Sequence, residues 1–370
     1  MRPASEVERR RLNDTFAALC RIRSVSGEEA AIAARVSDDL RGLGLEVESD
    51  EAGNVLARVG TRERSVMLCA HLDTVPHDGV VEPVLEGGAW VSAGDTILGA
   101  DNKAAVAVLL EVARRAAIES APVGLELLFT VGEEVALQGA KAFDLGRLRS
   151  ELGFVFDHAS PIGEVIVASP SYYRIEASFH GAAAHAGIRP EAGRSAIEAA
   201  AGAVSAMRLG RLDEETTANV GAIAGGTPGA TNVVPEHATL LAEARSLDDA
   251  KVEAVVAEMV DHIYDAANVP ACSCDVDIVV EKLFSGYKQR PLAPGVVAAE
   301  AALRACGYTP ERVVSGGATD ANAFEAAGFH CTNVANGTER NHQTDERVSV
   351  AALEGMLDVV YALLDEVAAG

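Results

Sequence analysis

The chain has 370 residues, of which 49% are hydrophobic and 23% are charged, and its formal net charge at pH 7 is −24. This balance is typical of a globular protein, and the length suits two domains. The negative charge excludes nucleic acid as a partner, because phosphate contacts need a basic face. It also argues against binding to an anionic membrane surface.

No run of about 18 apolar residues is present, so we expect no membrane-spanning segment. The stretch after the basic residues 9–11 is too short and too polar for the core of a signal peptide. Scattered cysteines are typical of reduced thiols and not of a disulfide or zinc-thiolate framework. They are Cys20, Cys69, Cys272, Cys274, Cys306 and Cys331. We therefore expect a cytoplasmic protein.

The first part of the chain predicts alternating helices and buried strands. Ser26 and Glu29 have the spacing of a capping box, and the amphipathic helix that follows ends at Gly42. A second, strong helix is expected over residues 103–117. Apolar runs predict strands that are covered by helices on both faces, at residues 66–70, 125–131 and 153–156. These elements indicate an α/β domain.

The middle of the chain predicts a different architecture, in the order βαββαβ, which is typical of a ferredoxin-like sandwich. The expected elements lie at about 171–179, 193–207, 217–223, 231–244, 248–267 and 273–281. From residue 294 the chain returns to helix and buried strand, with the last clear strand at 329–334. We therefore expect an α/β domain in two halves, residues 1–168 and 285–370, with an inserted α+β domain at 169–284.

Each apolar strand of the α/β domain leads to residues that can bind a metal ion. These residues are His71, the pair Glu133 and Glu134, Asp157 and, through a short loop, His342. A fifth candidate, Asp101, lies at the start of the 103–117 helix. Open α/β sheets bind ligands beyond the carboxyl ends of their strands. Any one of these residues alone could be an ordinary surface or core group, but their joint position predicts a site.

Histidine and carboxylate ligands without a thiolate suit Zn²⁺, with Mn²⁺ and Co²⁺ as alternatives. Two ions about 3.5–4 Å apart need a bridging ligand, and a carboxylate can bridge. Catalysis also needs a base that is not itself a ligand. The neighbouring carboxylates of Glu133 and Glu134 can supply one of each.

Nine segments in this order resemble the M20 metallopeptidase family, and within it the branch around peptidase T. They are HLDTVP (71–76), GADNKA (99–104), TVGEEVALQGA (130–140), FDHA (156–159), HGAAAHAG (180–187), GGTPGATNVVPE (225–236), AEARSLD (242–248), GGATDANAF (316–324) and NHQTDE (341–346). The resemblance covers nearly the whole chain. It implies a zinc-peptidase-like α/β/α catalytic domain with an inserted ferredoxin-like lid and dimerisation domain.

The resemblance implies two divalent ions with Asp101 as the bridging ligand. The implied ligand sets are His71, Asp101 and Asp157 for one ion and Asp101, Glu134 and His342 for the other. Asp73 would orient His71 by a hydrogen bond. Glu133 would be the general base for a water held between the ions.

The resemblance also assigns residues of the inserted domain. His185 would stabilise the oxyanion, often in the active site of the partner subunit, and His180 is a weaker candidate for this role. Asn232 and Arg245 would hold the substrate backbone or its carboxylate. A turn histidine and a cation on the sheet surface remain the alternatives for His185 and Arg245.

The resemblance thus implies a homodimeric aminopeptidase that hydrolyses peptide bonds in short peptides. Aspartate at position 157 favours an aminopeptidase, since the family's carboxypeptidases and deacylases tend to have glutamate there. The alternative is a deacylase or carboxypeptidase acting on N-acyl amino acids or C-terminal residues. The segment between His71 and Asp101 is shorter than in full-length tripeptidases, so the peptide length stays open. A non-catalytic metal-binding scaffold would have no use for Glu133.

Overall fold

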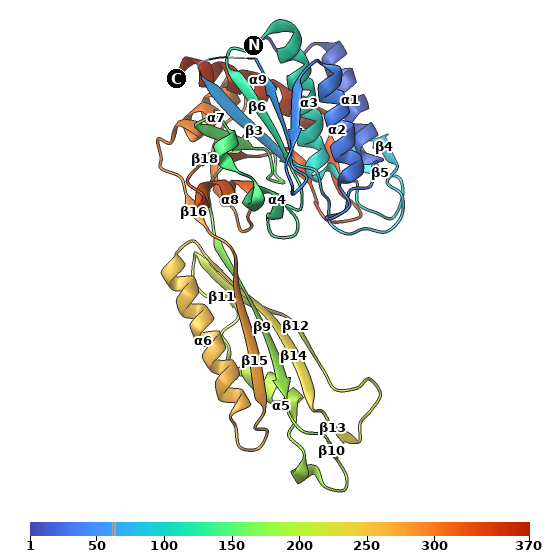
Figure 1. Ribbon diagram of the computed structural model, residues 1–370, viewed down its shortest axis with the longest axis vertical. Helices are drawn as coiled ribbons and strands as arrows, with labels where there is room; N and C mark the ends of the chain where they lie inside the picture. Colours follow the sequence, from blue (N-terminus) through green and yellow to red (C-terminus); the bar gives the residue numbers. More distant parts are fainter. Residues whose placement is uncertain (61, 63) are drawn as a thin grey trace. The chain divides into compact units, whose positions relative to one another are not determined.

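The computed structural model describes residues 1–60, 62 and 64–370. It divides the chain into two compact units (Figure 1). The first unit contains Met1–Ala168 and Lys288–Gly370, and the second contains Ser169–Tyr287. The second unit is thus a single insertion between two segments of the first, as the fold class predicted from the sequence requires.

The first unit is built on a mixed β-sheet with the strand order β1-β2-β6-β3-β7-β18-β8, and β17 pairs with β8. The strands are β1 (Glu46–Ser49), β2 (Val55–Val59), β3 (Ser65–His71), β6 (Gly124–Thr130), β7 (Leu152–Val155), β8 (Glu164–Ser169), β17 (Glu311–Val314) and β18 (His330–Val334). The short strand β16 (Tyr287–Lys288) lies where the chain returns to this unit.

Four neighbouring strands of this sheet, β6, β3, β7 and β18, run parallel to one another. Their carboxyl ends therefore lie along one edge of the sheet. The sequence places a metal-capable residue at or after the end of each of these strands. The topology thus brings groups from residues 71, 133–134, 157 and 342 to the same edge.

Helices cover both faces of the sheet. One face packs on α1 (Glu6–Cys20), α2 (Ala30–Gly42), α3 (Ala100–Glu119), α7 (Pro294–Ala305) and α9 (Val350–Ala369), which share one hydrophobic core with it. Along β3, Val66, Leu68 and Ala70 belong to that core, whereas Cys69 contacts Asp320 at the start of α8 (Asp320–Ala326). The period-2 alternation of a strand therefore places α8 on the opposite face. Next to α8 packs α4 (Gln138–Ala142).

A small sheet and a short 3₁₀ turn complete the first unit. The sheet has the order β19-β20-β5-β4, and the turn is η1 (Leu145–Arg147). The strands are β4 (Pro83–Glu86), β5 (Ala89–Ser92), β19 (Thr338–Glu339) and β20 (Arg347–Ser349).

The capping box predicted at Ser26 and Glu29 is wrong. The helix α2 starts later, at Ala30, and no side chain caps it. The Ser26 hydroxyl instead donates to Asp73, and the Glu29 carboxylate accepts the Gly132 N–H at 3.1 Å. Both side chains are used by loops that carry candidate site residues, and this tertiary use overrides the local cap.

The second unit has the expected βαββαβ order, with β9 (Ser171–His180), α5 (Ala196–Ala206), β12 (Thr216–Gly225), β14 (His237–Ser246), α6 (Asp249–Ala267) and β15 (Asp275–Phe284). Its sheet order, β12-β14-β9-β15 with β11 (Gly210–Arg211) at the edge, is that of a ferredoxin-like fold. Both helices pack on the face of the sheet that contains Ile175, Ala177 and Phe179.

One expected strand of the second unit is divided. Residues 231–244 were expected to form a continuous strand, but β14 starts only at His237. Ahead of it, β13 (Val233–Val234) pairs with β10 (Ala184–His185), and a 3₁₀ turn, η2 (Pro190–Ala192), follows β10. This two-stranded antiparallel pair holds His185 on β10, opposite Val233.

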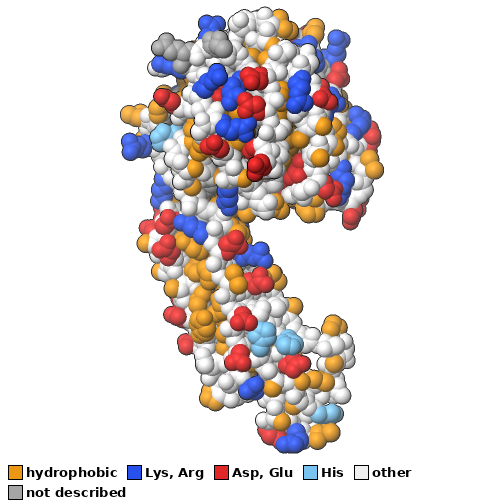
Figure 2. Space-filling view, viewed as in Figure 1, with side chains coloured by type: hydrophobic (Ala, Val, Ile, Leu, Met, Phe, Trp, Pro, Cys, Tyr) orange, Lys and Arg blue, Asp and Glu red, His pale blue; other side chains and the backbone are white. Residues whose placement is uncertain are grey.

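The surface and the thiols agree with the composition. On the face of each unit that Figure 2 shows, acidic and basic side chains are interspersed and form no continuous basic patch. All six cysteines are free thiols. Among the residues that the structure describes, none of the helices combines the length and apolar character needed to cross a bilayer.

Candidate metal centre

The five predicted metal ligands gather at the carboxyl edge of the four parallel strands. Two groups of three form, and Asp101 belongs to both. They are His71, Asp101 and Asp157, and Asp101, Glu134 and His342. In each group the candidate ligand atoms lie within 4.8 Å of one another. Asp101 is thus placed where a bridging ligand has to be.

His71, the last residue of β3, is 2% exposed and presents one ring nitrogen to two carboxylates. Its Nε2 lies 3.2 Å from Asp101 Oδ1 and 3.6 Å from Asp157 Oδ1. Its Nδ1 faces away, 3.0 Å from the backbone oxygen of Asp73 and 3.4 Å from the Asp73 carboxylate. This arrangement fixes the ring so that Nε2 is the available ligand atom.

The second group is closed by His342, which has a half-exposed side chain. Its Nε2 lies 2.9 Å from Glu134 Oε1 and 3.3 Å from Asp101 Oδ2. Asn341 donates a hydrogen bond to the same Asp101 oxygen at 2.8 Å. The two oxygens of Asp101 therefore point to different histidines.

Burial and neighbouring negative charge raise the pKa values of two carboxylates at this site, Asp157 and Glu133. Burial, opposed by the positive charge of His71 and reinforced by the negative charge of Asp101, raises the pKa of Asp157 to about 7. Burial and the charge of Asp157 raise the pKa of Glu133 well above its usual value. So dense a group of acids is stable only with protons or cations among them.

The histidines show the complementary shift. Hydrogen bonds that the His342 ring donates to the carboxylates of Asp101 and Glu134 raise the pKa of His342 to about 10. Burial alone would lower the pKa of His71, but Asp157, Asp101 and Asp73 raise it well above its usual value. Divalent cations would supply the positive charge that the protons supply here, and would release those protons.

Glu133 and Glu134 both lie near His71, and together the three residues form a third group of possible ligands. They differ in exposure and partners. Glu133 is 8% exposed, whereas Glu134 is half-buried and contacts His342. This difference suits Glu134 as a ligand and leaves Glu133 beside the ligands.

Asp73 does more than orient His71. It is fully buried, and its two oxygens accept the backbone N–H groups of Glu133 at 2.9 Å and of Glu134 at 3.1 Å. The Ser26 hydroxyl donates to it at 2.7 Å. One carboxylate thus links the β3 end to the β6 end, which sequence reasoning missed because only the folded loops show it.

Two further supporting residues were also not predicted. Asn333 on β18 accepts the Asp157 N–H at 3.0 Å and donates to the Asp157 carbonyl at 3.1 Å. Glu346 accepts three N–H groups of the loop before Asp101. Their only sequence signal is their position next to predicted strands or ligands, which by itself names no role.

The three predicted lid residues all lie in the second unit. His185 is exposed on β10, where its Nδ1 accepts the Gly187 N–H at 3.2 Å. Asn232 is close to it, since its carbonyl accepts the Ala186 N–H at 2.9 Å. Arg245, near the end of β14, forms an ion pair with Glu243 at 3.0 Å and stacks over the Tyr172 ring at 4.3 Å.

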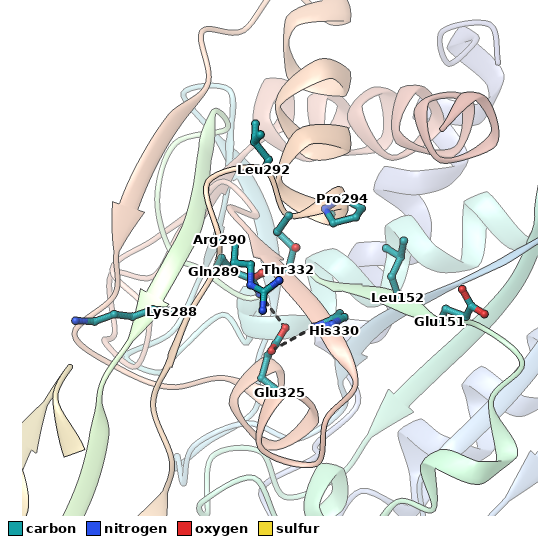
Figure 3. Close-up of a pocket in the computed structure, with 12 residues that line it drawn as sticks. Glu151, Leu152, Lys288, Gln289, Arg290, Leu292, Pro294, Glu325, His330 and Thr332 are labelled. Atoms are coloured by element: carbon teal, nitrogen blue, oxygen red, sulfur yellow. Dashed lines mark hydrogen bonds and ion pairs between the residues drawn. The ribbon is translucent and has the colours of Figure 1, made fainter. Parts of the chain in front are cut away.

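A cavity of the first unit, of about 460 Å³, lies at the edge of the sheet opposite to the candidate metal centre (Figure 3). It is next to Leu152 and His330, where β7 and β18 begin. Beside it, the Gln289 side-chain amide donates to Glu325 at 2.9 Å. None of the five predicted metal ligands lines it. The cavity is therefore distinct from the candidate metal centre.

Comparisons with known proteins agree with this architecture. The peptidase dimerisation domain of the M20 type matches residues 171–269, and peptidase family M28 matches residues 54–160. The uncharacterised protein YqjE of Bacillus subtilis is 36% identical over 98% of this chain and 100% of its own length.

Two solved structures match along nearly the whole chain. Aminopeptidase PepT from Bacillus cereus has a TM-score of 0.87 at 36% identity and covers 97% of this chain and 99% of its own. A tripeptidase from Staphylococcus aureus has a TM-score of 0.92 at 32% identity, and the match covers 98% of this chain and 99% of the tripeptidase chain. With the ligand groups above, these matches show that the chain belongs to the M20 family of metallopeptidases and to its peptidase T-like members.

Proposed function

We propose that this protein is a two-metal aminopeptidase that hydrolyses peptide bonds in short peptides. The observation that carries the proposal is the pair of ligand groups that share Asp101 at one edge of four parallel strands. Peptide hydrolysis also agrees with the names of the PepT and tripeptidase structures, which align along nearly the whole chain.

The donors fit two divalent cations. Each group offers imidazole nitrogen and carboxylate oxygen, the donor set that suits Zn²⁺ and also accommodates Mn²⁺ or Co²⁺. Bound ions would polarise the scissile carbonyl and lower the pKa of the attacking water toward about 7. We assign the ligand roles to His71, Asp101, Glu134, Asp157 and His342.

Glu133 is the proposed general base. It is buried beside the ligands, and its raised pKa favours a group that can hold a proton between two transfers. It takes a proton from the attacking water and returns it to the leaving amine. Asp73 holds the Glu133 backbone and so fixes where the carboxylate can reach.

A homodimer in which His185 serves the partner's active site is part of the proposal. Within the second unit, His185 and Asn232 lie at the His237 end of β14, and Arg245 lies eight residues along that strand. Eight residues of strand span about 26 Å, whereas three residues of extended peptide span only about 10 Å. One short substrate therefore cannot bind His185 and Arg245 of the same chain, but it can if His185 comes from a second copy.

We also place the protein in the cytoplasm. Six unpaired thiols, five of them buried, suit a reducing compartment.

The test is a panel of matched peptides supplied to the zinc-reconstituted protein, with products identified by mass. Tripeptides with a free amine should be cleaved after the first residue, and their N-acetylated forms should not be cleaved. Release of acetate or of a C-terminal residue would instead identify the deacylase or carboxypeptidase alternative. No turnover of any peptide by the metal-loaded protein would contradict peptide hydrolysis.

A further inference from the structure

Glu346 is a buried carboxylate that accepts hydrogen bonds from three backbone N–H groups. It is 1% exposed, and it accepts the N–H groups of Leu98 at 2.9 Å, Gly99 at 2.8 Å and Asp101 at 2.9 Å. A buried carboxylate is costly unless it is hydrogen-bonded, and three N–H donors are the kind of partner that offsets this cost. The three amides belong to the loop that ends at the proposed bridging ligand.

The same residue ends the turn that carries His342. The Glu346 N–H donates to the Gln343 carbonyl at 3.1 Å, and the Gln343 N–H donates to the Arg340 carbonyl at 3.3 Å. His342 and Arg340 have positive φ angles of 66° and 57°. A left-handed backbone is unfavourable for an L-residue, so the turn has to be held by contacts such as those of Glu346.

A buried ammonium lies on the other side of the loop. Lys103 is 1% exposed, and its Nζ donates to the Ile22 carbonyl at 2.8 Å. A Cβ placed on Gly99 would lie 3.4 Å from that Nζ. The 98–101 loop therefore passes close to the Lys103 ammonium while its amides are held by the Glu346 carboxylate.

We propose that Glu346 is a positioning residue for the metal centre, which joins the Asp101 loop to the His342 turn so that both ligands face the same ion. The proposal rests on the proposed two-metal function. The direct contacts between the Asp101 loop and the His342 turn agree with this role. Asp101 Oδ2 is 3.3 Å from His342 Nε2 and 2.8 Å from Asn341 Nδ2. Glu346 thus sets the distance between two ligands that are 241 positions apart in the sequence.

Glu346→Gln tests this role, because an amide keeps the shape but offers one acceptor oxygen. In the wild type, Oε1 accepts from Asp101, and Oε2 accepts from Leu98 and Gly99. Either orientation of the amide turns its NH₂ group toward backbone N–H donors. Glu346→Asp retains the charge but is one methylene shorter, so it should fall between the wild type and Glu346→Gln.

The matched control is Glu126→Gln. Glu126 is also a buried carboxylate that accepts two backbone N–H groups and a serine hydroxyl, from Arg149 and Ser150, and it differs from Glu346 in an added ion pair with Arg58 at 3.3 Å. It lies near the start of β6, away from the strand end that leads to Glu133. Its loss should destabilise the fold without changing the metal site.

The experiment measures zinc binding by calorimetry, amide exchange in the metal-free protein, and kcat and KM for a free-amine tripeptide. Glu346→Gln should weaken zinc binding about 10–100-fold, the usual effect of losing a group that supports a ligand. It should also speed exchange of the 98–101 amides selectively and lower kcat more than it raises KM. Glu126→Gln should leave zinc affinity, the relative exchange of the 98–101 amides, and kcat and KM unchanged. It should lower only the stability of the fold.

Zinc affinity, 98–101 exchange and kcat within twofold of the wild type in Glu346→Gln would overturn the proposal. A loss of zinc affinity in Glu126→Gln as large as that in Glu346→Gln would also overturn the proposal. If Glu346→Gln does not fold, Glu346→Asp supports or overturns the proposal by the same criteria. Failure of the wild type itself to bind zinc would instead refute the proposed two-metal function, so the two failures are distinguishable.

Discussion

Replacing Asp73 with asparagine should weaken both the fold and the metal site, because one carboxylate supports the backbone of two candidate site residues. The carboxylate accepts N–H groups from Glu133 and Glu134 on different oxygens, at 2.9 and 3.1 Å, and a hydroxyl from Ser26 at 2.7 Å. Whichever way the amide is oriented, its NH₂ group meets one of the two backbone N–H groups. Asp73→Asn therefore cannot satisfy both glutamates.

The size of the effect follows from these contacts. A hydrogen bond to a charged group contributes about 1.5–3 kcal/mol, and a buried donor left without an acceptor costs about 1–3 kcal/mol. We expect Asp73→Asn to lower the free energy of unfolding of the metal-free protein by about 2–4 kcal/mol by the same reasoning. Displacement of Glu133 and Glu134 should also lower metal affinity or turnover about 10–100-fold.

Denaturant unfolding, zinc calorimetry and peptide turnover measure the three quantities, with Glu126→Gln as the control. Glu126, near the other end of β6, accepts two N–H groups and a hydroxyl on one oxygen and pairs with Arg58 through the other, so its substitution should lower stability and leave zinc affinity unchanged. Zinc affinity and kcat within twofold of the wild type in Asp73→Asn would refute the proposed linkage. Equal losses of both in the two variants would mean that the effect is general destabilisation.

Three further substitutions test individual roles. Glu133→Gln should keep both ions and lose about 10²–10⁴-fold in turnover, as general acid–base help is lost; loss of metal would make it a ligand instead. Asp101→Ala should be the most damaging ligand change and should lose both ions, so retention of two ions by elemental analysis would contradict bridging. His185→Ala should lower kcat about 10²–10³-fold, the usual cost of one oxyanion donor, with little change in KM. Mixing it with Glu133→Ala should restore activity after subunit exchange, and no recovery despite verified exchange would contradict action across a dimer.

The candidate metal ligands gather at one edge of the sheet, as expected from the sequence, because the end of a buried strand can be recognised in the sequence and parallel strands bring their ends together. Apolar runs that lead to His71, Glu133 and Asp157 become parallel neighbours in one sheet, so their carboxyl ends have to meet. Asp101 is placed by the start of α3, and His342 by the loop after β18. Only the pairing of the strands was needed beyond the sequence pattern.

The supporting residues were not predictable in the same way. Ser26 and Glu29 have the local pattern of a helix cap, but the folded chain uses them for Asp73 and Gly132. Asn333 and Glu346 bind the backbone of other segments. Because almost every residue has a backbone N–H group, such a partner cannot be recognised from residue type. The strand β8 was missed because residues 164–169 are separated from β9 only by Pro170 and show no ligand at their end.

The central claim, a two-ion aminopeptidase, is tested most directly by titrating metal-free protein with Zn²⁺ while elemental analysis and cleavage of a free-amine tripeptide are followed together. We expect no turnover in the metal-free protein and full turnover only with two ions bound per chain, with the N-terminal amino acid as the released product. Undiminished turnover in protein shown to be metal-free, or saturation of both binding and turnover at one ion per chain, would contradict the account.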